Sequence, residues 1–307
     1  MFLDYSMNEN ILKELRAALL DRVAVNKLPE PVLERQSTTN TWGTNSIEGN
    51  TLSLGEVEKV LVDGKSVNNR PVRDILETVN HGKAFRELSS LIPRRMDLVV
   101  VQELHEKVFK GVKEDAGQWR RSNVKIRSSR YAPPRWEKVL PMMIEWEKEY
   151  ASKESTDANV FEVAALMHLR FESIHPFSDG NGRVGRLLMN LHFLKHNWPH
   201  VNITPLEKDR YFEALEKGRG EGADLSILVE FLKVMMAQSM LDILDQVGIE
   251  KEDRLITITE LGSKASHSAK YLALRANQGI LPAIKKAGEW TTSRRAIGLY
   301  ERLIGRE

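Results

Sequence analysis

The chain has 307 residues, 41% of them hydrophobic, and a formal net charge of +2 at pH 7. This length and composition support a sizeable hydrophobic core and favour two domains. The chain contains no cysteine, which excludes disulfides, thiolate catalysis and cysteine-based zinc sites. The N-terminus lacks a basic region followed by an apolar one, and charged residues interrupt the most apolar stretch, 225–244. We therefore expect neither a signal peptide nor a membrane span, and assign the protein to the cytoplasm.

The N-terminal part of the chain is predicted to be helical. Helices are expected at about 8–22 and 30–47, and the pattern Ser53 to Glu56 is a capping box that opens another helix. The polar segment that follows, 63–70, indicates a loop. We therefore predict an N-terminal helical region over residues 1–65.

The helical pattern continues through the middle of the chain, residues 66–248, which we predict to be the core domain. Helices are predicted at 72–89, 97–110, 136–150, 158–173, 184–196, 207–217 and 224–245. Residues 117–134 break this pattern, because Val124 and Ile126 alternate with polar residues such as Lys125 and two prolines follow. The alternation predicts a short β-hairpin with a Pro-terminated edge, which by itself indicates only a surface feature.

A run of twelve residues, 175–186, joins two of the predicted core helices and reads HPFSDGNGRVGR. Its Gly180, Asn181 and Gly182 can turn successive backbone N–H groups inward as an anion-binding nest at the start of the second helix. Arg183 and Arg186 follow on one face of that helix. Two cations oppose the helix dipole there, and a bound anion would remove this conflict.

The same run contains the groups for acid–base chemistry. His175 is the motif group that can take a proton near neutral pH, so it is the candidate general base for a hydroxyl. Asp179 offers hard oxygen ligands that suit Mg2+ bridging two phosphates. The nest and Arg183 would hold phosphate oxygens and stabilise the charge that develops on the reacting phosphorus. We interpret the run as an active site.

The C-terminal residues 249–307 form a third predicted part. Residues 251–307 hold eleven Lys and Arg against six Asp and Glu, a net charge of +5. Short helices, a turn and a later helix resemble a small winged helix-turn-helix module of the excisionase-like kind. Such modules contact DNA phosphates through basic residues, but a protein-binding or dimer-forming module with Trp290 as a core anchor fits equally well.

The run at 175–186 resembles the signature of Fic-domain proteins, His-x-Phe-x-Asp/Glu-Gly-Asn-Gly-Arg-x-x-Arg. Its fixed positions are His175, Phe177, Asp179, Gly180, Asn181, Gly182, Arg183 and Arg186. The resemblance implies a mainly α fold whose core uses ATP to place AMP on a Ser, Thr or Tyr hydroxyl of a target protein. It further implies that Arg186 reaches the γ-phosphate.

The resemblance also gives roles to two segments outside the run. Val124, Lys125 and Ile126 would lie on a flap that pairs with an extended target segment. Tyr211 follows the second motif helix, where family members supply residues to the adenine pocket, so it either stacks on the base or packs in the core.

A second segment, residues 44–50, reads TNSIEGN and resembles the Ser/Thr-x-x-x-Glu-Gly/Asn inhibitory motif of the same family. By that resemblance, Glu48 pairs with Arg186 and blocks the productive position of the γ-phosphate. Without the core motif, the same residues would indicate a helix end capped by Gly49, with Glu48 as a solvated surface charge.

These observations favour a self-inhibited protein adenylyltransferase with ATP as substrate and Mg2+ as cofactor. Its partner would be a target protein that presents a hydroxyl, with a homodimer as a further possibility. A different hypothesis is a DNA-associated regulatory protein whose core senses nucleotide. The same motif could also remove AMP from a target or transfer another phosphate-containing group.

Overall fold

The structure is a computed structural model that describes residues 6–126, 129–154, 159–220, 222–248, 250–262 and 267–304. The chain divides into two compact units. The smaller unit contains Met1–Val32, Asn197–Val201 and Leu232–Glu307, and the larger unit contains Leu33–His196 and Asn202–Phe231. The predicted parts were separated at residues 65 and 248. The two units are divided differently, because the first helix groups with the C-terminal part. The three-part organisation stays a prediction.

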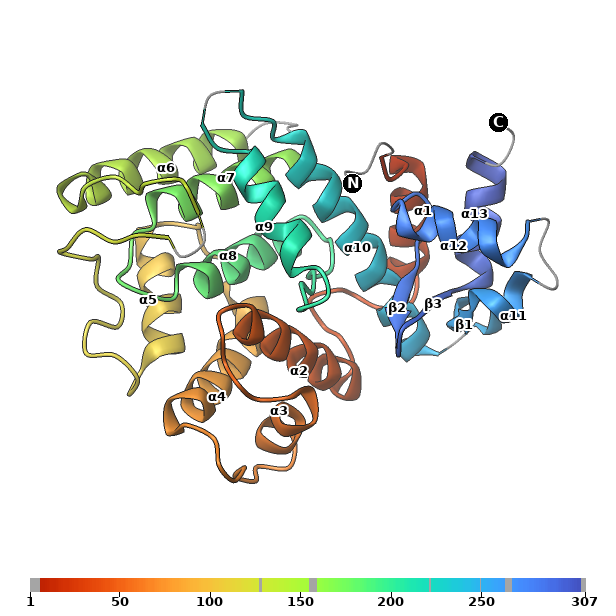
Figure 1. The fold of residues 1–307 in the computed structure, drawn as a ribbon, viewed down its shortest axis with the longest axis horizontal. Coiled ribbons are helices and arrows are strands. Elements are labelled where there is room, and N and C mark those ends of the chain that lie inside the picture. Colours follow the sequence, from red (N-terminus) through yellow and green to blue (C-terminus); the bar gives the residue numbers. More distant parts are fainter. Residues whose placement is uncertain are drawn as a thin grey trace. The chain divides into compact units, whose positions relative to one another are not determined.

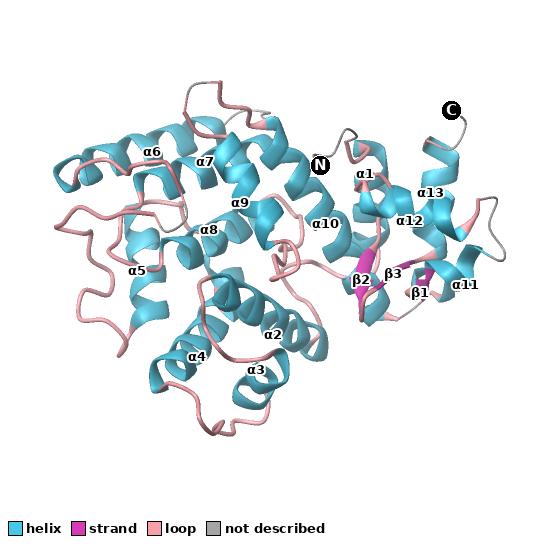
Figure 2. Cartoon of the chain, in the orientation of Figure 1, coloured by secondary structure: helices cyan, strands magenta, loops and turns pink. Residues whose placement is uncertain are grey.

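Most of the larger unit is helical (Figure 1, Figure 2). Its elements are α2 (Glu30–Ile47), α3 (Leu54–Leu61), α4 (Val72–Arg86), η1 (Leu88–Leu91), α5 (Leu98–Phe109), η2 (Trp136–Lys138), α6 (Val139–Glu154), α7 (Val160–Ile174), α8 (Asn181–Lys195) and α9 (Lys208–Lys217). The long helix α10 (Ser226–Val247) begins in this unit, and the division between the units falls inside it. The predicted helices all form, and α8 begins at Asn181, three residues before its predicted start.

The central helix of the larger unit is α8. Every residue from Asn181 to Leu194 is buried, and the helix packs against α7, α5 and η1. A helix that is buried on all sides must bury its polar residues too, and these need partners. The polar residues at the start of α8 are those of the predicted active site, so the core of the unit itself fixes their positions.

The ends of the helices follow capping rules. Ser53 and Glu56 form the predicted capping box at the start of α3, with each side chain bonded to the backbone of the other residue. Asn159 caps α7 by accepting hydrogen bonds from the N–H groups of Phe161 and Glu162. The N-cap residue of α8 is Gly180, which has no side chain to accept a hydrogen bond. The first N–H groups of α8 are therefore not used by a capping side chain.

The segment predicted as a hairpin contains no strand among its described residues, 117–126 and 129–134. Arg127, at the end of the predicted first arm, lies outside the described residues. Side chains hold the two arms together in place of a backbone ladder. Arg120 donates to the carbonyls of Ser122 at 2.9 Å and Pro134 at 2.6 Å, and Asn123 Oδ1 accepts from the N–H of Trp136. The β-hairpin prediction is therefore wrong for these residues.

The smaller unit contains the sheet of the described structure. Its elements are α1 (Glu9–Leu20), η3 (Lys251–Asp253), β1 (Ile256–Thr257), α11 (Ile258–Gly262), α12 (Ala269–Asn277), β2 (Ile284–Lys286), β3 (Glu289–Thr292) and α13 (Arg294–Leu303). The strands are antiparallel in the order β1-β3-β2. Ala287 and Gly288 both have positive φ, which matches the two-residue turn that joins β2 to β3.

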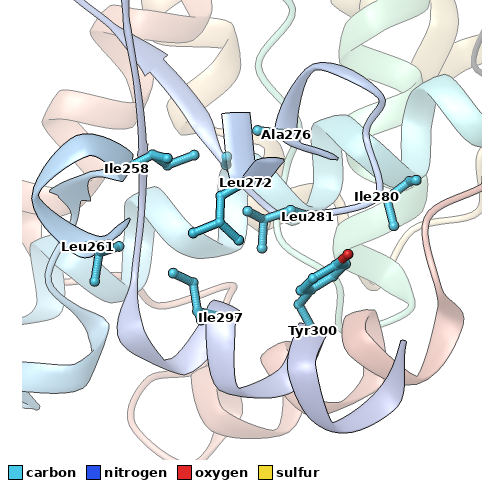
Figure 3. Packing of buried hydrophobic residues seen from close by; sticks show 9 residues of the cluster. Ile258, Leu261, Leu272, Ala276, Ile280, Leu281, Ile297 and Tyr300 are labelled. Atoms are coloured by element: carbon cyan, nitrogen blue, oxygen red, sulfur yellow. The ribbon is translucent and has the colours of Figure 1, made fainter. Parts of the chain in front are cut away.

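Helices α11, α12 and α13 of the smaller unit share one apolar cluster with the segment that follows α12 (Figure 3). Leu272 of α12 and Tyr300 of α13 are fully buried in it, and Trp290 of β3 packs against its edge. The order α11, α12, hairpin is the one that a winged helix requires, and α1 packs against α13 in addition. The winged-helix assignment stays a prediction.

Three of the eleven cations of residues 251–307 pair with carboxylates of the same unit. Arg295 pairs with Asp253 and Glu252, Lys286 pairs with Asp242 at 3.0 Å, and Arg302 pairs with Glu14 at 3.2 Å. Asp242 and Glu14 lie outside residues 251–307, so these two pairs offset part of the net charge of +5 that the segment could present to DNA phosphates. Within the described residues, no helix has the length and apolar character needed to cross a membrane.

Candidate active site

The loop between α7 and α8 gives His175 an unusual backbone conformation. His175 has φ 52°, in the left-handed region, and its N–H closes α7 on the carbonyl of Phe171 at 2.9 Å. Its Nδ1 lies 3.3 Å from the carbonyl oxygen of Glu172. A carbonyl can only accept, so Nδ1 carries the proton and Nε2 keeps its lone pair. Burial lowers the pKa of His175 to about 4, which leaves the imidazole neutral at pH 7.

Two neighbours fix the loop that carries this histidine. The Asn181 side chain accepts from the Phe177 N–H at 2.9 Å and donates to the Phe177 carbonyl at 3.0 Å. Phe177 is fully buried, and its ring stacks on His105 with centroids 3.8 Å apart. The side chain of Asn181 therefore shapes the loop, and only its backbone N–H remains for the predicted anion nest. Phe177 anchors the loop in the core.

Gly180 has φ 85°, and a Cβ built on it would lie 2.0 Å from Cε2 of Phe109. Gly180→Ala is expected to lower the free energy of unfolding by about 2–5 kcal/mol, since left-handed strain and overpacking add. Gly64→Ala is the matched control, because Gly64 also has positive φ (64°) but no atom within 4 Å. It should lose only about 1–2 kcal/mol. Urea unfolding measures both, and equal losses would contradict the role of Phe109.

Asp179 belongs to a closed ring of four charged side chains, which we call the charge ring: Arg73, Glu77, Arg183 and Asp179. Arg73 Nε donates to Glu77 Oε1 at 2.9 Å, and Arg73 Nη2 donates to Asp179 Oδ2 at 2.7 Å. Arg183 Nη1 lies 2.7 Å from Glu77 Oε2, and Arg183 Nη2 lies 3.5 Å from Asp179 Oδ1. Burial raises the pKa of Asp179, but Arg183 and Arg73 outweigh it and hold the pKa below its usual value.

Arg73 and Glu77 were not predicted as residues of the site. They are an i,i+4 pair on a predicted helix, which is the common pattern of a solvated helix face. Only the packing of α4 beside the motif brings them to Asp179 and Arg183. The spacing of opposite charges was the one available signal, and it does not distinguish a surface pair from half of a charge ring.

Asp179 is chemically suited to a magnesium ion. Its side chain is 39% exposed, and the described residues contain no group of three or more His, Asp or Glu placed to hold a metal. Mg2+ commonly takes one or two carboxylates, keeps several waters and binds substrate phosphates. A single accessible carboxylate beside a helix N-terminus fits that mode of binding.

The predicted contact between Glu48 and Arg186 is present. Glu48 Oε1 accepts from Arg186 Nη2 at 2.6 Å, while Thr44 accepts from Arg186 Nε through its Oγ1 at 2.6 Å and from Nη2 through its carbonyl at 3.2 Å. The side chain of Arg186 is 5% exposed and that of Glu48 is 29% exposed. Gly49, with φ 96°, ends the helix as the simpler interpretation expects, but the part-exposed Glu48 is paired with Arg186.

Gly182 makes room for this contact. A Cβ built on Gly182 would lie 2.1 Å from Glu48 Oε1 and 2.9 Å from Arg186 Nη1. The glycine of the motif therefore leaves the space that the carboxylate of Glu48 occupies, directly over the first turn of α8. Glu48 and the run at 175–186 therefore meet at this position.

Tyr211 lies in the core. It is fully buried, its hydroxyl is 2.7 Å from Nε2 of His168, and Nη1 of Arg186 lies 3.5 Å from the same oxygen. A ring with no exposed face cannot stack on a base in this conformation, so the packing alternative describes Tyr211 better. His168 is likewise buried, and burial lowers its pKa to about 3.

The segment with Val124, Lys125 and Ile126 is tied to the active-site loop at one end. Arg120 is 3% exposed, and its Nε donates to the carbonyl of His175 at 2.8 Å. Its backbone N–H donates to the carbonyl of Pro176 at 2.9 Å. Lys125 is exposed, while Val124 and Ile126 are partly exposed. Arg120 was not predicted as a site residue, because its partners are backbone atoms distant in sequence.

Comparison with known proteins agrees with this geometry. Residues 95–193 match the Fic/DOC family. The chain is 29% identical over 194 residues to the protein adenylyltransferase Fic of Drosophila ananassae. The aligned region covers 62% of this chain and 38% of the relative. It is 29% identical over 190 residues to the protein of the same name from Aedes aegypti, and this alignment covers 61% of the chain and 37% of that relative. The chain thus spans less than two fifths of the length of these relatives.

Solved structures resemble the chain over a larger share of its length. A Fic domain containing signaling protein from Bacteroides thetaiotaomicron matches with a TM-score of 0.69 and 22% identity, over 77% of this chain and 97% of that one. A Fic family protein from Desulfovibrio desulfuricans G20 matches with a TM-score of 0.66 and 20% identity, over 94% and 97%. At these identities the likeness concerns the fold, and it confirms the mainly α fold.

Proposed function

We propose that this chain, which contains a Fic/DOC domain, is a protein adenylyltransferase that transfers AMP from ATP to a hydroxyl side chain of a target protein or of itself. One observation carries the proposal. A single loop brings together a neutral imidazole with a free Nε2, an accessible carboxylate and the uncapped N-terminus of a buried helix. These are a base, a site for a phosphate-bound cation and a site for phosphate oxygens.

The reaction follows from the atoms of the loop. His175 Nε2 accepts the proton of the target hydroxyl, and the oxygen attacks the α-phosphorus of ATP. The bond between that phosphorus and the oxygen bridging to the β-phosphate breaks, and pyrophosphate leaves. N–H groups of the first turn of α8 and the guanidinium of Arg183 would stabilise the charge on the phosphate oxygens. A magnesium ion on Asp179 would neutralise charge on the phosphates.

The target is proposed to bind along residues 123–126. These residues form neither helix nor turn, and no strand within the described chain pairs with them. An extended peptide could therefore form backbone hydrogen bonds there, with Val124 and Ile126 contacting alternate side chains. Arg120 would keep this segment in register with His175, because it bonds to the carbonyl of the catalytic residue itself.

The pair Glu48–Arg186 is proposed to be an inhibitory latch. If Arg186 binds the γ-phosphate, the carboxylate of Glu48 competes with that phosphate for the same guanidinium. ATP could then bind only in a position shifted from the productive one. The proposal is supported by the 2.6 Å contact and by the space that Gly182 leaves for the carboxylate.

Mass spectrometry tests the proposed activity. Glu48→Gly protein is incubated with ATP, Mg2+ and a lysate of the source cells, and proteins that gain one AMP are identified. A gain of AMP on lysate proteins or on the chain itself is expected. Its absence from every protein, with ATP binding intact, would contradict the enzyme and favour the nucleotide sensor.

A further inference from the structure

The charge ring has a buried half and an accessible half. The side chains of Glu77 and Arg183 are 5% and 3% exposed, whereas those of Arg73 and Asp179 are 55% and 39% exposed. Breaking the buried pair would leave an uncompensated charge in the core, which is strongly unfavourable. The accessible pair between Arg73 and Asp179 contributes little in water and can exchange partners. A ligand that reaches the ring therefore acts on Arg73 and Asp179.

Arg73 occupies one of the two oxygens that Asp179 could offer to a cation. Its Nη2 is 2.7 Å from Oδ2, while Oδ1 faces Arg183 at the longer distance of 3.5 Å. This N–H group uses one of the two lone pairs of Oδ2, and the positive charge of Arg73 opposes a cation that approaches the same atom. Arg73 can give up its hydrogen bond to Oδ2 without leaving the charge ring, because its Nε keeps the separate hydrogen bond to Glu77.

We propose that Arg73 is a positioning residue of the active site, which holds the Oδ2 atom of Asp179 and competes with the divalent cation for it. The inference rests on the proposed function in one respect, namely that Asp179 binds the metal. Arg73 lies on α4, outside the residues that match the family. Direct competition makes cation binding weaker in the free protein than a single accessible carboxylate would allow, so the site fills when the nucleotide phosphates add their own oxygens.

Binding of Mn2+ in the absence of nucleotide, measured by water proton relaxation, tests this competition. Arg73→Gln is expected to bind Mn2+ about two- to fivefold more tightly than the wild type, as removal of a half-exposed ion pair implies. Lys113→Gln is the matched control. Lys113 also lowers the pKa of Asp179 through its charge, but its salt bridge is to Asp115. An equal gain in both variants, or none in Arg73→Gln, would overturn direct competition.

Two further variants separate this inference from the function on which it rests. Asp179→Asn should lose the Mn2+ site; if it binds as the wild type does, the metal assignment fails. If Asp179→Asn loses binding and Arg73→Gln equals the wild type, only the competition fails. Arg73→Lys keeps the charge but not the two separate N–H donors, so its affinity should lie between wild type and Arg73→Gln. Circular dichroism confirms that each variant is folded, and weaker binding by Arg73→Lys than by wild type would contradict the proposal.

Discussion

Replacing Glu48 with glycine is expected to raise the rate of AMP transfer by up to about 100-fold. A latch that is closed in 99 of 100 molecules requires only about 2.7 kcal/mol. Removing one partner of a fully buried charge pair typically costs about 3–5 kcal/mol. The pair here has a buried Arg186 and a part-exposed Glu48, so a contribution near the lower end of that range is enough. Arg186 keeps both contacts to Thr44 when Glu48 is removed, so its guanidinium stays in place for a phosphate. The initial rate of AMP incorporation with ATP and Mg2+ measures the change.

Glu48→Gln is the matched control for this experiment, since it keeps the length of the side chain and removes its charge. Its rate should lie between those of the wild type and Glu48→Gly, because a neutral amide oxygen still accepts a hydrogen bond from Arg186. Rates are compared per folded molecule, with unfolding followed for each variant. Equal labelling by wild type and Glu48→Gly would refute the latch while leaving the activity itself intact.

The sequence predicted the parts of the fold that depend on local chemistry. The capping box at Ser53 and the apolar spacing of α7 and α8 are local patterns, so these helices could be located from the sequence alone. The start of α8 was placed too late, because glycines usually end helices, whereas Gly180 here supplies a left-handed turn directly before one. The pairing of α1 with α13 could not be predicted, because an amphipathic pattern shows that a face is buried but not against what.

The features that the sequence left undecided or predicted wrongly depend on contacts between distant segments. Residues 123–126 alternate between polar and apolar side chains as strands do. The buried side chain of Arg120 nevertheless donates to the carbonyls of Ser122 and Pro134, in place of backbone hydrogen bonds between two strands. Tyr211 follows the motif helix at a suitable distance for a base, yet its hydroxyl completes a buried network with His168 and Arg186. The motif residues could be predicted because their chemistry is concentrated in twelve consecutive positions. Arg73 of the charge ring could not be predicted, since it lies on another helix.

Replacing His175 with alanine, in the Glu48→Gly background, is expected to reduce AMP transfer by at least about 100-fold, the usual range for loss of a general base. Alanine has one complication at this position. His175 has φ 52°, and a left-handed backbone costs an alanine about 1–2 kcal/mol. Lost activity in that variant could then reflect a distorted loop. His175→Asn avoids this ambiguity, since asparagine tolerates the left-handed region and provides no base.

Both variants should therefore lose transfer while nucleotide binding persists, because Arg183 and the first turn of α8 are unchanged. The pH dependence gives an independent measurement on the protein that retains His175. The base must be neutral, and burial lowers its pKa to about 4, so protonation of His175 should reduce kcat/KM only as the pH falls toward 4. Transfer by His175→Asn at the rate of its parent would show that another group takes the proton. An acid limb near 6.5 would mean that the imidazole is solvated in the working enzyme, and that the loop opens further when the latch is released.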